Sequence, residues 1–296
     1  MAGSVIFNSE NARDAEVIKD PDCVDIAEEA EELKDVLSIL RQSKILPVDF
    51  SVSKSLQYGA TCDAFVLTMW GKKHFLKMLK PEYRDSEKYL NIIRREFLTC
   101  YPLDHPSIPR YLQAGKEFII MDNIEGFSLD EFVEKKTDYF RNESNVRRFL
   151  KQLLSGLIYL HESDIIHGDL KPENIMMTKV CHNVKIVDFG FSYSIGFSKF
   201  MGSTKRFCAP EVWEYPERGD RCSDIYSFGK ILQWLDLYPR IADRCTKESP
   251  DDRYQSCEEI AEEMGIMPSD QLYENFPGNQ KKLRTDEFWN TDHKDI

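Results

Sequence analysis

The sequence lacks the features that mark several large classes of protein. Its eight cysteines are scattered without any Cys-x-x-Cys pair, which predicts reduced thiols in a cytoplasmic protein rather than disulfides or a zinc site. No apolar run approaches the ~18 residues that span a bilayer, and no basic-then-apolar leader opens the chain. The net charge of −12 disfavours nucleic acid or an anionic membrane as the main partner.

What is present indicates a globular protein with a sizeable core. Hydrophobic residues make up 42% of the 296 residues and aromatic residues 12%, which is enough for one large domain or two lobes. The pattern predicts a strand-rich segment followed by a helical one. Strands are expected at 64–70 and 73–79, which flank a hairpin turn at Gly71-Lys72, at 117–126, leading into a loop, and at 183–190, running into a turn. Helices are expected at 86–101, 145–163, 223–235 and 256–264. Ser256 and Glu259 predict a capping box at the start of the last helix.

The N-terminal region predicts one further helix. Asp20-Pro21 resembles an N-cap followed by proline at the first helical position, and the helix should end before Pro47. Its apolar stripe consists of Val24, Ala27, Ala30, Leu33, Leu37 and Leu40. This stripe favours a helix packed against the following domain. The alternative is a docking or dimerisation element.

The stretch IIHGDLKPENIMM, residues 165–177, carries the main chemical signal. Phosphoryl transfer needs a hydroxyl held in line, metal ions on the phosphates and cations over the developing charge. Asp169 could accept the hydroxyl proton, and Asn174 offers an amide oxygen to a divalent cation. Asp188, in the Asp-Phe-Gly that follows 14 residues after Asn174, would supply the main carboxylate to the metal. The Asp-x4-Asn pair alone is a weak signal for phosphoryl transfer, and the Asp-Phe-Gly that follows it makes the signal strong.

Over residues 50–265 these motifs, in this order, resemble the catalytic domain of eukaryotic-type serine/threonine protein kinases. Residues 167–174 resemble the catalytic loop, and Lys171 is typical of its serine/threonine-specific members. The resemblance implies an α+β bilobal fold, with a small antiparallel-sheet N-lobe and a mainly helical C-lobe. It further implies that Glu211 of CAPE pairs with Arg253, and that Asp224 braces the catalytic loop. His167 is then structural, and His161 is expected to cap a helix end.

The same resemblance assigns residues of the small lobe. Lys77 would hold the α- and β-phosphates of ATP, and Glu96, 19 residues later, would position Lys77. Gly59 belongs to the glycine-rich loop over the phosphates. Thr204 would hydrogen-bond the catalytic Asp169. The adenine site would be formed by Met121 at the back and by the hinge residues Asp122, Asn123 and Ile124.

Two departures from the family pattern concern the nucleotide. The glycine-rich loop keeps only Gly59, so it should offer fewer backbone amides to the phosphates, and Asp63 is expected to bring a negative charge close to them. Phe75 stands where the family usually has a small alanine against the adenine ring. Both departures favour the alternative of a weak or inactive pseudokinase scaffold.

Two further departures concern regulation and docking. Gly168 replaces the arginine that in the family receives a phosphorylated activation-loop residue, so activity is expected not to require that phosphate. Only 42 positions separate Glu211 from Arg253, which predicts a minimal C-lobe that lacks much of the region after its central helix.

These observations predict an ATP-dependent protein serine/threonine kinase that uses Mg²⁺ or Mn²⁺ and acts on a protein substrate. The expected domains are an N-terminal extension (1–49), an N-lobe (50–124), a C-lobe (125–265) and a polar tail (266–296). Small-molecule and atypical phosphotransferases also carry His-Gly-Asp loops and are the second alternative, although they generally lack the APE element and its arginine.

Overall fold

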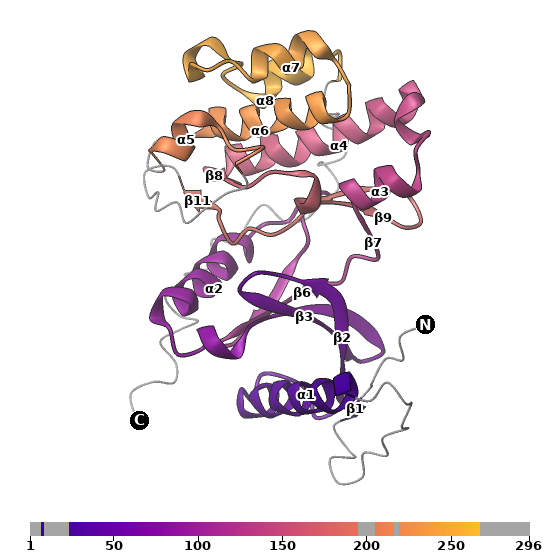
Figure 1. The fold of residues 1–296 in the computed structure, drawn as a ribbon, viewed down its shortest axis with the longest axis vertical. Helices are drawn as coiled ribbons and strands as arrows, with labels where there is room; N and C mark the ends of the chain where they lie inside the picture. The colour runs from indigo at the N-terminus through magenta and orange to yellow at the C-terminus, as the bar shows by residue number, and fades with distance from the viewer. Residues whose placement is uncertain (1–6, 9–23, 195–204, 216–218, 267–296) are drawn as a thin grey trace. The chain divides into compact units, whose positions relative to one another are not determined.

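The chain divides into two compact units, which are described separately. The computed structural model describes residues 7–8, 24–194, 205–215 and 219–266 (Figure 1). Unit 1 comprises Met1–Phe97 and Arg110–Asn123, and unit 2 comprises Leu98–Pro109 and Ile124–Ile296. The segment Leu98–Pro109, expected in the N-lobe, therefore lies with unit 2.

Unit 1 is built on a six-stranded antiparallel sheet with the strand order β1-β2-β3-β4-β6-β5. Helix α2 follows β4 through a short 3-10 turn, η1, and its last residues belong to unit 2. The elements are β1 (Phe7–Asn8), α1 (Val24–Gln42), β2 (Phe50–Tyr58), β3 (Cys62–Met69), β4 (Lys72–Leu79), η1 (Pro81–Tyr83), α2 (Glu87–Cys100), β5 (Tyr111–Ala114) and β6 (Phe118–Asp122).

The predicted hairpin between β3 and β4 is present, with its turn one residue earlier than expected. Met69 pairs with Lys72, so Trp70 and Gly71 form a two-residue loop. Both have positive φ, at 50° and 72°, as the twist-matched hairpin turns require. Glycine adopts this conformation readily and tryptophan does not, which is why the sequence pointed to Gly71-Lys72 instead.

Helix α1 covers one face of the unit 1 sheet (Figure 1). Its stripe residues Leu33, Leu37 and Leu40, together with Val36, are almost fully buried. They share a single core with sheet residues that include Phe65, Leu67, Leu76, Met78 and Ile120. The apolar stripe from residue 33 onward is thus used within unit 1, as the packing interpretation predicted. The start of the helix at Asp20-Pro21 lies outside the described residues.

Unit 2 is mainly helical, with short strands that carry its loops. Its elements are β7 (Gly126–Ser128), α3 (Leu129–Lys135), η2 (Tyr139–Arg141), α4 (Glu143–Glu162), β8 (Ile165–Ile166), η3 (Pro172–Asn174), β9 (Ile175–Thr178), β10 (Val184–Ile186), β11 (Tyr193–Ser194), α5 (Pro210–Glu214), α6 (Arg221–Trp234), α7 (Pro239–Cys245), η5 (Pro250–Asp252) and α8 (Cys257–Glu263).

Helix α6 is the buried centre of unit 2, beside α4 and α7 (Figure 1). A Cβ on Gly229 would lie 2.4 Å from the Cβ of Cys245, so this glycine lets α6 and α7 approach closely. Residues 235–238 lead directly from α6 into α7, with no docking helix between them, as expected for a minimal C-lobe.

The last predicted helix is present as α8, and Ser256 caps it by accepting a hydrogen bond from the Glu259 amide at 3.3 Å. Glu259 bonds back to the amide of Gln255 rather than to that of Ser256, so the predicted capping box is displaced by one residue.

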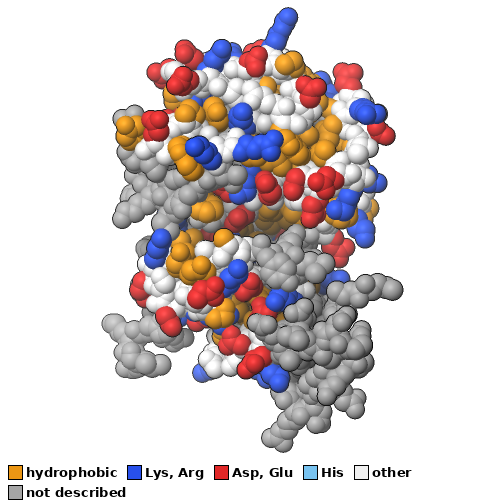
Figure 2. Space-filling model, in the orientation of Figure 1, with side chains coloured by type: hydrophobic (Ala, Val, Ile, Leu, Met, Phe, Trp, Pro, Cys, Tyr) orange, Lys and Arg blue, Asp and Glu red, His pale blue; other side chains and the backbone are white. Residues whose placement is uncertain are grey.

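Figure 2 shows acidic and basic side chains interspersed over both units on the face in view. Within the described residues, no helix combines the length and the apolar character that crossing a membrane requires.

Candidate active site

In unit 1, Lys77 of β4 and Glu96 of α2 form an ion pair. The ammonium of Lys77 lies 2.8 and 3.0 Å from the two carboxylate oxygens of Glu96. Glu96 is only 2% exposed and also accepts a hydrogen bond from the Tyr111 hydroxyl at 3.0 Å. Burying a carboxylate is costly unless it is paired, and these contacts provide the pairing. The resemblance to the kinase family implied this ion pair, whereas Tyr111 had no signal in the sequence.

Phe75 lies on the same sheet face as Lys77, because strand side chains alternate between faces. Its direct neighbours across the sheet are Val66 on β3 and Met121 on β6, while Ala64 lies opposite Lys77. The face opposite the α1 core therefore carries a lysine flanked by apolar side chains. Phe75 is partly buried there, beside the residue expected at the back of an adenine site.

The loop that contains Gly59 is closed by backbone hydrogen bonds. The Gly59 amide donates to the Cys62 carbonyl at 3.1 Å, and the Lys80 amide donates to the Thr61 carbonyl at 3.0 Å. A Cβ on Gly59 would lie 3.0 Å from the Cys62 carbonyl oxygen, so the tight turn favours glycine.

Asp63 does not lie on the Lys77 face, which corrects the expectation of a charge close to the phosphates. It pairs with Met78, and alternation places it on the α1 face with Phe65. Burial raises the pKa of its carboxyl, as does the nearby Glu32 of α1, while Lys80 and Lys54 oppose the rise. The error arose because the one-residue alternation was not resolved in the sequence.

The predicted hinge lies where the chain passes from unit 1 to unit 2, between Asn123 and Ile124. Met121 is buried on β6, and Asp122 ends that strand. The Asp122 amide donates to the Arg110 carbonyl at 2.9 Å, and its carboxylate accepts from the Arg110 amide at 3.3 Å. The backbone before the crossing is therefore tied to the start of β5.

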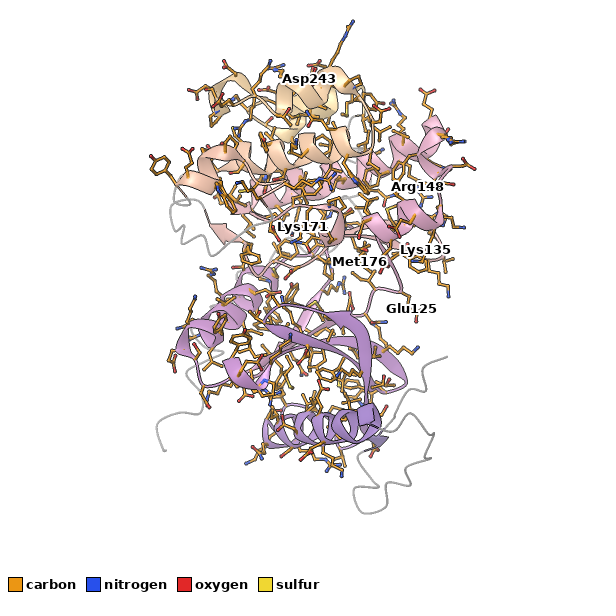
Figure 3. The ribbon with its side chains drawn as sticks, viewed as in Figure 1. Glu125, Lys135, Arg148, Lys171, Met176 and Asp243 are labelled. Carbon is orange, nitrogen blue, oxygen red and sulfur yellow. The ribbon has the colours of Figure 1, made fainter. Side chains whose placement is uncertain are left out.

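In unit 2, the residues expected in the catalytic loop converge on Asp169. This carboxylate is 4% exposed, and its Oδ2 accepts hydrogen bonds from the Lys171 ammonium at 2.6 Å and the Asn174 amide at 3.1 Å. Asn174 also donates to the Asp169 carbonyl at 2.8 Å. These bonds engage the nitrogen of the Asn174 amide and so turn its oxygen away from Asp169. Figure 3 labels Lys171 in this loop.

Asp224 of α6 holds the backbone before Asp169. Its fully buried carboxylate accepts hydrogen bonds from the amides of His167 at 2.8 Å and Gly168 at 3.0 Å. Burial alone would raise the pKa of this carboxyl, but the hydrogen bond from His161 and the loop contacts hold the pKa below its usual value. The predicted bracing contact is therefore present.

The sequence suggested that His161 caps a helix end, and the structure shows that it does not. Its Nε2 lies 3.0 Å from Asp224, and its Nδ1 lies 3.7 Å from the thiol of Cys257. It belongs to the buried support of the loop, a role that depends on α6 and α8. No local pattern reports such a contact.

The backbone conformation at position 168 favours glycine, independently of the expected effect on regulation. Its φ is +78°, in the left-handed region that side chains disfavour. Substitution at this position would strain the backbone directly after the two amides that reach Asp224.

The Asp-Phe-Gly turn is anchored to the same loop. Asp188 has a φ of +62°, Phe189 is fully buried, and its ring centre lies 5.0 Å from that of His167. The imidazole of His167 reaches the Val187 carbonyl at 3.1 Å, and the Val187 amide donates to the Asn174 carbonyl at 2.9 Å. The structural interpretation of His167 agrees with these contacts.

The structure describes only the far end of the predicted activation segment in detail. Thr204, together with Ser198 and Ser203, lies outside the described residues. At the far end, Arg253 donates to both carboxylate oxygens of Glu211, at 2.7 and 2.8 Å, and to three backbone carbonyls. Arg253 is 1% exposed and Glu211 is partly exposed, and their bidentate pair ties the APE helix α5 to the segment before α8.

The donor set fits a hard divalent cation. Asn174 would offer an amide oxygen and Asp188 a carboxylate, the ligand types that Mg²⁺ prefers. Among the described residues, no group of three or more His, Cys, Asp or Glu side chains gathers into a metal-binding cluster. A cation held by Asn174 and Asp188 would therefore need further ligands from water or from a phosphate.

Known protein kinases resemble about half of this chain. The serine/threonine-protein kinase PrkC of Bacillus subtilis (strain 168) is 27% identical over 166 residues, which are 53% of this chain and 25% of that protein. Sperm motility kinase 2B of Mus musculus is 35% identical over 161 residues, 51% of this chain and 32% of that protein. The aligned parts thus span only a quarter to a third of these relatives.

A solved structure and a family profile agree with this resemblance. The kinase domain of Mycobacterium tuberculosis PknI has a TM-score of 0.59 and 20% identity, and the match covers 73% of this chain and 95% of that domain. This neighbour shows the protein-kinase fold. The family described as "Protein kinase domain" matches residues 50–237. This match covers more than half of the chain, and the chain therefore belongs to the protein kinase family.

Proposed function

We propose that this chain transfers the γ-phosphoryl group of ATP to serine or threonine hydroxyls of a protein substrate. The observation that carries the proposal is the convergence of Lys171 and Asn174 on the Asp169 carboxylate, with Asp224 holding the loop behind it. A preset base beside a cation is what an in-line phosphoryl transfer requires from the protein.

In this mechanism Asp169 orients the substrate hydroxyl and takes its proton. The hydroxyl oxygen forms a bond to the γ-phosphorus as the bond to the bridging oxygen of ADP breaks, and the proton goes to the Asp169 carboxylate. Lys171, 2.6 Å from that carboxylate, is placed to stabilise negative charge on the transferred group. Asn174 holds Asp169 in position through its two hydrogen bonds.

Unit 1 would bind the nucleotide. Lys77, positioned by Glu96, would contact the α- and β-phosphates, and the Gly59 loop would cover them. The backbone at Asp122, Asn123 and Ile124 would face the adenine, with Met121 behind it. Bound at Asn174 and Asp188, Mg²⁺ or Mn²⁺ would neutralise phosphate charge.

A protein substrate is favoured over a small molecule by the Glu211–Arg253 pair. The small-molecule families with His-Gly-Asp loops generally lack this element, and here the pair is bidentate and its arginine is buried. Serine or threonine specificity rests on Lys171. A cytoplasmic location, where ATP is supplied, accords with the seven described cysteines, none of which is in a disulfide.

The test compares the wild type with Asp169→Asn in ATP and Mg²⁺ with a basic protein as acceptor. Phosphate incorporation read by intact mass should fall about 10³-fold, because the general base is lost. Asp243→Asn, an exposed aspartate on α7 labelled in Figure 3, is the matched control and should leave the rate unchanged. Equal rates in wild type and Asp169→Asn would refute the assignment. Transfer to an aminoglycoside or a sugar instead of protein would favour the small-molecule class.

A non-catalytic scaffold is the second candidate, and Phe75 is the observation that favours it. Phe75 lies on the same sheet face as Lys77 and is paired across the sheet with Met121 of β6, the residue expected behind the adenine. A shift in melting temperature on addition of ATP and Mg²⁺ separates the two candidates. If Phe75 blocks the site, Phe75→Ala should create a shift that the wild type lacks.

Activity should not require phosphate on the activation segment, because Gly168 has no side chain to receive it. Ser192 is already buried, and its hydroxyl donates to the Phe189 carbonyl at 2.7 Å. Replacing Ser194, Ser198 or Ser203 by alanine should leave activity within about twofold. Complete loss at one of them, restored by an acidic mimic, would contradict this regulation. Thr204 is excluded from the series because it is expected to bond Asp169.

A further inference from the structure

Besides the shared apolar core, a polar link through Arg84 connects helix α1 to the strand that carries Lys77. The guanidinium of Arg84 forms an ion pair with Asp35 of α1 and donates to the Leu79 carbonyl at 2.8 Å. It also lies 3.6 Å from the Glu117 carboxylate and 3.6 Å from the Met78 sulfur. The Arg84 side chain is 12% exposed and that of Asp35 is 48% exposed, so the contacts with β4 are shielded from water while the ion pair with α1 lies at the surface.

The residues around Arg84 form a connecting segment, residues 80–86, between β4 and α2. At its start, the Lys80 amide bonds the Thr61 carbonyl in the loop that follows Gly59. At its end, the ring centre of Tyr83 lies 4.4 Å from that of Tyr89 on α2. The connecting segment thus touches both the Gly59 loop and the first turn of the helix that carries Glu96.

Helix α1 is itself held firmly on the sheet. Its stripe from Leu33 to Leu40 is buried on the face opposite Lys77, and Glu32 forms an ion pair with Lys54 of β2. Asp35 therefore presents its carboxylate to Arg84 from a helix with little freedom to move. The charge on α1 can act on the connecting segment as a fixed anchor.

We propose that α1 is a built-in positioning element for the Lys77–Glu96 pair and acts through Arg84. By anchoring the connecting segment, Asp35 and Arg84 limit the movement of α2, so that Glu96 remains within reach of Lys77. Neither residue touches the pair, so both are positioning residues. The effect of this anchoring on catalysis rests on the proposed function, whereas its effect on the mobility of α2 does not.

The test uses Arg84→Ala and Asp35→Asn in the full chain. Amide hydrogen exchange in residues 87–97 of α2 should become about tenfold faster in Arg84→Ala and less so in Asp35→Asn, because α1 no longer restrains the segment. Exchange in α4 and α6 of unit 2 should not change. Arg84→Lys keeps a cation and one donor and should recover part of the protection. Arg240→Ala, an exposed arginine on α7, is the matched control.

Kinetics supply the second measurement. In Arg84→Ala the KM for ATP should rise about tenfold with a smaller change in kcat, and Asp35→Asn should add nothing further in that background. Unchanged exchange in α2, or exchange accelerated equally in both units, would overturn the inference. A wild type that transfers no phosphate while α2 still responds to Arg84→Ala would refute the proposed function and leave the positioning role intact.

Discussion

The two units hold their charged residues in different ways. In unit 1, Lys77 and Glu96 come from a strand and a helix 19 residues apart, and their distance depends on how α2 packs. In unit 2, Asp169 and Asn174 lie five residues apart in one loop, and Asp224 fixes the loop backbone from a buried helix. The first arrangement can be adjusted by small movements of a helix, whereas the second is preset. Regulation is therefore expected to act on unit 1.

The largest effect in unit 1 should come from removing the Lys77 cation. Lys77→Met should lower kcat/KM by at least about 10²-fold, because the phosphates lose their positioning charge. It should also destabilise the fold, since the Glu96 carboxylate is buried and loses its ammonium partner. Adding Glu96→Gln should recover stability but not activity, as read by thermal unfolding and phosphate transfer. Activity that returns with stability would contradict a direct role for Lys77.

A structural ion pair in unit 2 should behave differently. Arg253→Gln should cost about 3–5 kcal/mol of unfolding free energy, because Glu211 loses its partner and three carbonyls lose a donor. Urea denaturation of the variant, with the exposed Arg240→Gln as control, measures this cost. A loss below about 1 kcal/mol would show that the pair is dispensable.

Acid should destabilise unit 2 through His105. Burial lowers the pKa of this imidazole from 6.5 to about 4, helped by Lys185 and opposed by Asp104. The unfolded chain then binds a proton that the folded chain does not, so stability falls as the pH drops from 6.5 toward 4, by up to about 3 kcal/mol.

His105→Asn tests this pH dependence. Asparagine can still accept the Ser107 amide, which lies 3.0 Å from the imidazole Nδ1. Urea unfolding at several pH values should show a shallower loss of stability between pH 6.5 and 4 in the variant. An unchanged slope would assign the acid sensitivity to other groups.

The smallest effect should come from Asp63 in unit 1. Its pKa is raised, so its ionised form is disfavoured in the folded state and stability falls as pH rises above the ordinary value of 3.8. Asp63→Asn should therefore stabilise the protein at pH 7 by less than about 1 kcal/mol. Below pH 3.8 the substitution should have no effect on stability. Melting temperatures at pH 7 and pH 3.5 give the comparison. A destabilising effect at pH 7 would mean that Lys54 or Lys80 outweighs burial and Glu32.

Much of the site could be predicted because its chemistry is local. The loop around Asp169 and the turn at Asp188 are short segments in which residue type and spacing carry the information. The Lys77–Glu96 and Glu211–Arg253 pairs were also predicted, because the motifs around them resemble those of the kinase family. Helices α2, α4, α6 and α8 were placed to within a few residues by their apolar periodicity.

The failures concern which side of an element a residue faces and what lies across from it. Asp63 was expected near the phosphates, but the pairing of Asp63 with Met78 turns it toward α1. His161 was expected at a helix end and instead faces Asp224. Tyr111 and Arg84 carried no signal, because their partners lie on other elements.

The sequence by itself determined the family, the order of the elements and the loop chemistry, since these depend on hydrophobic periodicity and on residues close together along the chain. Only the tertiary structure decided that α1 closes one face of the sheet and that Arg84 joins it to the segment before α2. Such contacts depend on strand register and on packing between distant elements. A shift of one residue in register would reverse every face, and neither composition nor spacing specifies it.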